Sequence, residues 1–408
     1  YRRQRTAAGD YEPAPTQVQV ELEVDRSAQA AYLTAGGRDL VLHAGEWSDW
    51  VRVEFEFVPW LASTTALARF HLRQVEPYVE LFVSPLQIDP AEPAVPVSSP
   101  PEWAPELCAA LGPFATEGMP EQTNGFLHGV LSASEFYEQI MLVFDETRRL
   151  HRHLQERHED GLLFVYYGTL DQACHMLWHF DDPQHPLHQP GHAMQGSIAR
   201  LYAAMDTVLG EVQASLPADA TLIIMSDHGF APFYRAVNLN TWLLEEGFVG
   251  LRDPARQEQT RLFDNVDWRR TRAYAMGLNG IYVNLAGRER DGIVAPGAAY
   301  EELLDDLEQR LLQMVDPRSG QRVVSSVVRS RRDLHGDHAS AGPDLLVGYS
   351  RGYRSSWESP LGEFPRNVIV DNLQAWSGDH CIDPALVPGV LLSNRRITLE
   401  RPALHDLG

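Results

Sequence analysis

The sequence predicts an α/β fold in which helices flank a largely parallel sheet, joined to a small β-rich accessory unit. Short apolar runs at 162–167, 222–225 and 390–392 are typical of strands buried on both faces. Stretches of helical periodicity lie at about 198–212 and 300–314. Because strands that alternate with helices need crossover connections, the sheet is expected to be largely parallel.

The first 86 residues carry no such alternation of helix and strand. Residues 1–15 are rich in Arg and then in Ala, Gly and Pro, which predicts a leader or linker without a functional site. From 16 to 86 the apolar residues recur at every second position, as in Val51, Val53 and Phe55. This pattern predicts an antiparallel β-rich accessory unit, either a lid or rim beside the next domain or a structural insert.

An α/β domain is predicted from 106 to 408. It follows a Pro-rich segment, 87–105, which favours an extended connector over a helix. Ser132 and Glu135 form a capping-box pattern, and Phe136 and Ile140 follow at helical spacing, so a helix should begin there.

Composition limits the partners of the chain. Its 408 residues are 44% hydrophobic, enough for a sizeable core, and its formal net charge of -22 argues against nucleic acid as a partner. An acidic enzyme still binds a small phosphate ester where bound dications reverse the local field. Cys108, Cys174 and Cys381 form no even disulfide framework, and no apolar run reaches transmembrane length. The compartment stays open, with the cytoplasm slightly favoured, and the oligomeric state is not predicted.

The apolar run at 222–225 ends in Ser226-Asp227-His228-Gly229-Phe230. Ligands of open α/β sheets bind at the carboxyl ends of strands, so this acid and imidazole are candidate site residues. The alternative is a loop in which Asp227 caps the next helix and His228 is solvated.

Two further clusters of acid and imidazole lie beside predicted strands. Asp171 and His175 are four positions apart, so on one helical turn they share a face and can bind one cation. Gly378-Asp379-His380 precedes the strand at 390–392, and its competitor is Gly336-Asp337-His338. Mixed nitrogen and oxygen ligands suit zinc, with manganese as the alternative.

The order of these motifs closely resembles the alkaline phosphatase superfamily, and within it the type I phosphodiesterase and nucleotide pyrophosphatase group, over about residues 78–397. The resemblance implies an alkaline-phosphatase-like sheet and two divalent metals. By position, Asp171, His175 and His380 would hold one metal, and Asp227 and His228 would bind the second. His380 is preferred to His338 because the family's ligand also precedes the final strand.

The family completes its site with an early Asp and a Thr or Ser nucleophile, and neither is found in this sequence. Because the chain begins at Tyr1 rather than Met, we expect a fragment that lacks the nucleophile segment and is impaired in catalysis.

The resemblance implies metal-dependent hydrolysis of a phosphodiester or pyrophosphate bond in a small substrate. The alternatives are a phosphomonoesterase of the same superfamily and a non-catalytic, metal-stabilised binding module. Residues that bind substrate are not predicted. His179, one turn beyond His175, is expected to be a solvated histidine or one that supports a ligand. Arg235, Asn238 and Asn240 are expected to be structural, with contact to the substrate as the alternative.

Overall fold

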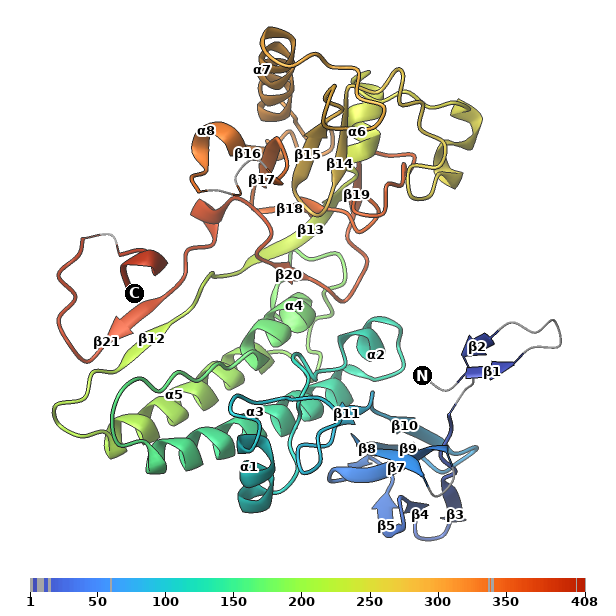
Figure 1. The fold of residues 1–408 in the computed structure, drawn as a ribbon, viewed down its shortest axis with the longest axis vertical. Helices are drawn as coiled ribbons and strands as arrows, with labels where there is room; N and C mark the ends of the chain where they lie inside the picture. The colour runs from blue at the N-terminus through green and yellow to red at the C-terminus, as the bar shows by residue number, and fades with distance from the viewer. Residues whose placement is uncertain are drawn as a thin grey trace. The chain divides into compact units, whose positions relative to one another are not determined.

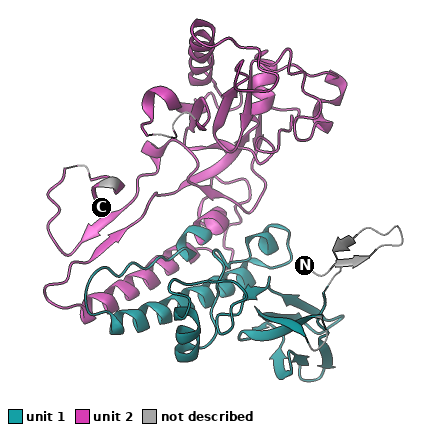
Figure 2. Ribbon diagram, viewed as in Figure 1, with its two compact units in different colours: residues 1–172 teal, residues 173–408 magenta. Residues whose placement is uncertain are grey.

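The computed structural model describes residues 3–5, 11–13, 16–58, 61–336, 338, 341–400 and 402–407. The chain divides into two compact units, Tyr1–Gln172 and Ala173–Gly408 (Figure 2). The division falls inside helix α4 (Thr169–Asp181).

Unit 1 contains antiparallel sheets of short strands (Figure 1). The strands are β1 (Arg3–Arg5), β2 (Tyr11–Pro13), β3 (Glu21–Asp25), β4 (Ala30–Ala35), β5 (Arg38–His43), β6 (Glu46–Trp47), β7 (Val51–Val58), β8 (Ala62–Ala68), β9 (Phe70–Gln74), β10 (Glu80–Val83) and β11 (Gln87–Ile88). They pair in the orders β1-β2, β3-β4-β5, β10-β9-β6 and β11-β8-β7.

The alternation of apolar and polar residues at 16–86 produces a buried apolar cluster in this unit. Leu33, Val51, Phe70 and Leu72 are buried together in one apolar cluster. In β4 and β5 the alternate side chains Tyr32 and Val41 are exposed, whereas His71, between Phe70 and Leu72 in β9, is also buried. The tight turn between β4 and β5 depends on Gly36, whose φ is +55° and whose missing Cβ would overlap the backbone of a neighbouring strand.

Three helices complete unit 1 before α4: α1 (Trp103–Leu111), α2 (Thr123–Leu127) and α3 (Ala133–Arg157). The predicted capping box is confirmed at the start of α3. The Ser132 hydroxyl accepts the amide N–H of Glu135, and the Glu135 carboxylate accepts the amide N–H of Ser132. Two of the four amides that a helix start leaves unpaired are thus satisfied.

Unit 2 contains most of α4 and the helices α5 (Ser197–Ser215), α6 (Leu239–Glu245), α7 (Ala298–Leu312) and α8 (Ser330–Asp333). Short 3₁₀ helices span Pro254–Gln259, Pro384–Leu386 and Leu404–Leu407. Its four-stranded antiparallel sheet has the order β14 (Ala273–Met276), β15 (Gly280–Val283), β17 (Leu345–Tyr349), β16 (Val324–Arg329). The apolar faces of α6 and α7 join this sheet in one core, in which Leu243, Ile281 and Leu307 are completely buried. Full burial of each such side chain is worth about 1.5–3 kcal/mol.

Strand β13 (Ala231–Val237) organises the second sheet of this unit. It pairs in parallel with β18 (Gly352–Ser355) and antiparallel with β19 (Ile369–Asp371) and β20 (Gly378–Asp379). Because β13 begins directly after Phe230, this sheet brings Asp227, His228 and the segment around His380 into one region (Figure 1).

The mixed α/β class is confirmed, but the sheets are mostly antiparallel. Among the strand pairings of the described residues, β13 with β18 is parallel and the other pairings of named strands are antiparallel. The apolar run at 162–167 forms no strand, and Leu162, Phe164 and Tyr166 are exposed. The runs at 222–225 and 390–392 do contain strands, β12 (Ile223–Met225) and β21 (Leu391–Ser393), but they pair only with each other. A two-stranded ribbon cannot bury both faces, which explains why Ile223 and Leu392 are about half exposed.

In the part of the chain that the structure describes, each helix is too short or too polar to cross a bilayer. The division into two units falls at another place than the predicted domain boundaries at 15, 86 and 105, and these boundaries stay predictions.

Candidate metal centre

The segment Ser226–Phe230 connects two strands, β12 and β13, and not a strand and a helix. Ser226 is fixed on both sides: its amide donates to the Val390 carbonyl (2.9 Å), and its hydroxyl accepts the Val390 amide (2.9 Å). Gly229 is required by close approach, since a Cβ there would lie 2.7 Å from the carbonyl oxygen of Pro388. Asp227 and His228 are therefore presented from a constrained turn, and the interpretation of Asp227 as a helix cap is wrong.

The segment that carries His380 is bound to helix α4. The Ser377 amide donates to the His175 carbonyl (2.7 Å), and the Ser377 hydroxyl accepts the His179 amide (3.1 Å). At Gly378 the segment runs against the helix backbone so closely that a Cβ would overlap the Cys174 carbonyl. Small side chains at 377 and 378 thus place His380 beside His175.

Three of the predicted ligands come together in unit 2. The His228 and His380 rings are stacked, with centroids 3.6 Å apart and planes at 11°, and the His175 ring lies 5.1 Å from that of His380. Phe230 packs edge-on against all three imidazoles, and Trp376 lies 3.9 Å from the His175 ring. Three imidazoles from three separate segments converge within an aromatic surround.

The hydrogen bonds of two of these imidazoles select one tautomer. His175 Nδ1 lies 2.8 Å from the carbonyl oxygen of Gly378, and His228 Nδ1 lies 3.1 Å from that of Gly229. A carbonyl oxygen accepts, so each Nδ1 carries the proton and each Nε2 keeps its lone pair. Metal-ligating histidines are commonly oriented in this way by a backbone carbonyl.

Burial favours the neutral, metal-binding form of two of these imidazoles, His175 and His380. It lowers the pKa of His175 to about 4, against the attraction of the Asp379 charge. Burial also lowers the pKa of His380, and the neighbouring His228 lowers it further. The donor chemistry of the cluster, imidazole nitrogens with the Nδ1 atoms of His175 and His228 bonded to backbone carbonyls, fits a divalent metal such as zinc.

The two predicted carboxylate ligands differ in setting. Asp227 is largely exposed, with one oxygen 3.2 Å from the His228 amide and the other 3.6 Å from His228 Nε2. Asp171 lies in the first turn of α4, one turn before His175, at the end of unit 1, and its Oδ2 accepts a hydrogen bond from Gln172 (3.0 Å).

Sequence reasoning missed the role of Asp379. Its Oδ1 accepts the amides of His380 (2.8 Å) and Cys381 (2.7 Å), and its Oδ2 accepts the Trp376 indole N–H (2.7 Å). The carboxylate also lies 2.6 Å from Nε of buried Arg354. Asp379, His380 and Cys381 offer ligand atoms within 4.8 Å of one another, but an acid with four donors around it is placed to orient the segment and not to bind a metal. An Asp directly before a candidate His ligand was the available signal.

The competing and neighbouring histidines have other settings. His338 is exposed, and Asp337 lies outside the described residues. His179 is buried, so it is not solvated, and its Nδ1 lies 3.0 Å from the Ser377 hydroxyl. His179 therefore supports the segment that carries His380.

The polar residues after the motif are structural, as the sequence indicated. Arg235 pairs with buried Asp316 (3.0 Å), and Asn238 donates to the Asn367 carbonyl (2.8 Å). Asn240 bonds both the amide and the carbonyl of Ala275.

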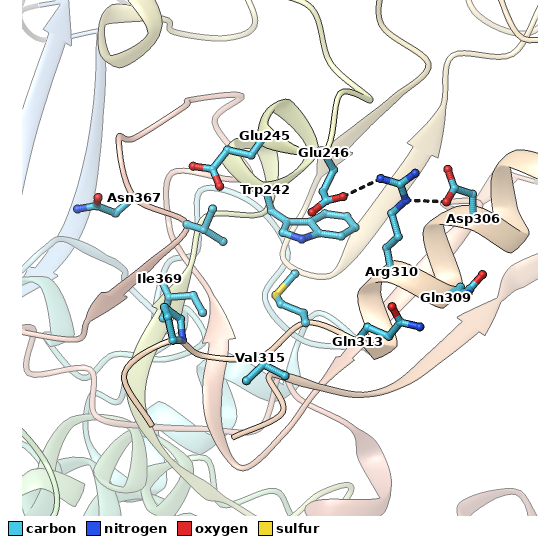
Figure 3. A pocket seen from close by; sticks show the side chains of 13 residues that line it. Trp242, Glu245, Glu246, Asp306, Gln309, Arg310, Gln313, Val315, Asn367 and Ile369 are labelled. Carbon is cyan, nitrogen blue, oxygen red and sulfur yellow. Dashed lines mark hydrogen bonds and ion pairs between the residues drawn. The ribbon is translucent and has the colours of Figure 1, made fainter. Parts of the chain in front are cut away.

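A large groove of about 950 Å³ lies elsewhere in unit 2, between α6, α7 and β19 (Figure 3). Its floor includes Trp242, and its rim carries the ion pairs of Arg310 with Glu246 (2.8 Å) and Asp306 (2.6 Å). None of the predicted ligands lines it, so its size alone does not make it the reactive centre.

The family model for type I phosphodiesterase / nucleotide pyrophosphatase matches residues 90–361, which include four of the five predicted ligands and leave out His380. A search of the curated proteins found no match. Because the family model covers about two thirds of the sequence, the chain belongs to the type I phosphodiesterase/nucleotide pyrophosphatase family of the alkaline phosphatase superfamily.

Proposed function

We propose that this protein hydrolyses a phosphodiester or pyrophosphate bond of a small substrate with the help of two divalent metals. Membership of the family supports this class of hydrolysis in general. The convergence of the His175, His228 and His380 rings around Phe230 carries the proposal for this chain. In the proposed ligand sets, Asp171, His175 and His380 hold one metal, and Asp227 and His228 bind the other.

Zinc is the proposed metal, with manganese as the alternative, because the ligands combine imidazole nitrogen and carboxylate oxygen. When bound, two such metals stabilise charge on the entering and leaving oxygens of an in-line displacement. The residues of the chain supply the setting for that chemistry. The bonds from His175 and His228 Nδ1 to backbone carbonyls direct Nε2 toward a ligand. The Phe230 and Trp376 rings pack against the imidazoles and hold them in position.

We further propose the domain organisation that the sequence predicts: a leader at 1–15, a β-rich accessory unit at 16–86, a connector at 87–105 and the metallohydrolase domain at 106–408. No nucleophile is assigned to a residue of this chain.

The test is an assay of the natural full-length protein after metal removal and readdition of zinc or manganese. Bis(p-nitrophenyl) phosphate serves as the diester and p-nitrophenyl phosphate as the monoester. We expect metal-dependent turnover of the diester at a higher kcat/KM than that of the monoester, and loss of turnover in Asp227→Ala. The reverse preference would identify a phosphomonoesterase. Metal binding without turnover of either ester would identify a binding module and contradict the proposal.

A further inference from the structure

A buried ion pair involves the residue directly before His380. Arg354 in β18 and Asp379 in β20 are each 1% exposed, and Arg354 Nε lies 2.6 Å from Asp379 Oδ2. Both strands pair with β13, so the two charges meet across one sheet.

The guanidinium of Arg354 is held in a fixed position. It lies 3.9 Å from the ring centroid of Trp357 and 5.3 Å from that of Phe233, and its Nη1 donates to the Ser355 carbonyl (3.0 Å). Stacking on aromatic rings suits the planar guanidinium and would not be reproduced by a lysine. The Arg354 guanidinium thus provides a positive charge in a fixed position, against which the Asp379 carboxylate packs.

Asp379 in turn fixes the backbone at the proposed ligand His380 by hydrogen bonds. One oxygen accepts the amides of His380 and Cys381, and the other accepts the Trp376 indole, whose ring lies against His175. A single carboxylate therefore fixes the main chain at His380 and the ring that covers His175.

We propose that the Arg354–Asp379 pair is the positioning device of the metal centre: it sets His380 and Trp376 at the geometry that a metal requires. The inference rests on the proposed function, because it takes His175 and His380 as ligands. A buried ion pair generally adds little net stability. Where such a pair orients a metal ligand, its loss weakens metal binding.

The test measures the affinity of the whole chain for zinc alone, by competition with a chromophoric chelator. It also records the visible absorption of the cobalt-substituted protein, which reports ligand geometry. Asp379→Asn keeps the size of the side chain but removes its charge. Arg354→Lys keeps the charge but removes the planar guanidinium. We expect zinc affinity to fall about 10- to 100-fold in each, with an altered cobalt spectrum, as when outer partners of metal ligands are removed.

A matched control separates positioning from loss of stability. Asp344 is equally buried and pairs with Arg288 (2.6 Å) and Tyr300 (2.7 Å) beside a different sheet. Asp344→Asn should lower the urea midpoint comparably and leave zinc affinity unchanged. In the double variant Arg354→Met/Asp379→Leu no buried charge is unpaired, but the amides of His380 and Cys381 and the Trp376 indole lose their acceptor. We therefore expect the midpoint to recover in part while zinc affinity stays low.

The outcomes distinguish the two proposals. Equal zinc affinity in the wild type and Asp379→Asn, or full recovery of affinity in the double variant, would overturn the positioning role and leave the proposed function standing. Absence of zinc binding by the wild-type chain would overturn the proposed function and this inference together.

Discussion

Unit 2 contains two candidate binding regions, the groove of Figure 3 and the histidine cluster, and they differ in the partners of their polar groups. In the groove of Figure 3, Arg310 is paired with Glu246 and Asp306, so the charges satisfy one another at the rim. In the histidine cluster, the Nδ1 atoms of His175 and His228 are engaged by backbone carbonyls, and the rings converge in an aromatic surround.

The comparison teaches that the volume of a depression is a poor guide to chemistry. The groove offers about 950 Å³, yet none of the predicted ligands lines it. The cluster has imidazole donors, two of which are held by hydrogen bonds to backbone carbonyls. Preorganised donors and not empty volume identify a metal centre.

The strongest test of this contrast is His380→Ala. Removal of a direct ligand should reduce zinc affinity by more than about 100-fold, beyond the range for loss of an outer partner. Isothermal titration of zinc into the metal-free chain measures the change. The matched control is His338→Ala, because His338 belongs to the competing Gly-Asp-His motif and is exposed. If the His338 variant lost the metal and the His380 variant kept it, the ligand assignment would be wrong.

Gly378→Ala tests whether close approach to α4 builds the cluster. The new Cβ would overlap the Cys174 carbonyl, so the segment must shift away from His175, at a cost of about 1–3 kcal/mol in the free energy of unfolding. Urea denaturation checks this value, and zinc titration should show weaker binding. Gly210→Ala is the control, because a Cβ at that position would meet no atom within 4 Å and alanine favours helix α5. A Gly378 variant as stable as the wild type would contradict the packing argument.

The pH dependence of stability tests the support from His179. Burial and, to a smaller extent, nearby His185, His192 and His188 together lower the pKa of His179 from 6.5 to about 4. The unfolded chain therefore binds this proton first as the pH falls. The stability contribution is complete above about pH 6.5 and is lost between there and pH 4. Between pH 7 and pH 5 the loss is about 2 kcal/mol for this group.

His179→Gln should reduce the difference in unfolding free energy between pH 7 and pH 5 by about that amount, measured by urea denaturation of the metal-free chain. His128→Gln, at an exposed position, should leave the difference unchanged. An unchanged difference in the His179 variant would show that His179 is not a buried neutral group.

The smallest effect is expected in the groove. Arg310→Ala removes two ion pairs that are exposed to solvent, and such pairs contribute little. Zinc affinity and diester turnover should equal those of the wild type, and the thermal midpoint should barely change. A large loss of turnover in this variant would mean that the groove takes part in the reaction.

Much of the local structure could be predicted from the sequence because it depends on neighbours along the chain. The capping box at Ser132 and Glu135 begins α3, and the helical periodicity at about 198–212 and 300–314 corresponds to α5 and α7. The motif at Asp227 and His228 lies in the turn at which the His228 ring stacks on that of His380.

The burial and direction of the strands could not be predicted in the same way. The apolar run at 222–225 became β12, but Ile223 is about half exposed because the strand pairs only with β21. The run at 162–167 formed no strand at all. An apolar run indicates that burial of the segment would lower its free energy, but it does not identify the segment that buries it, which comes from elsewhere in the fold.

The sequence by itself determined the residue types of the candidate centre, the helices α3, α5 and α7 and the family, since these follow from local periodicity and short motifs. Only the tertiary structure decided that Arg354, far from any motif, meets Asp379, and that Ser377 and Gly378 bring His380 beside His175. The physical reason is that a buried charge and a close backbone contact each need a partner, and strand β13 brings β18 and β20, both more than a hundred residues further along the chain, to the same sheet.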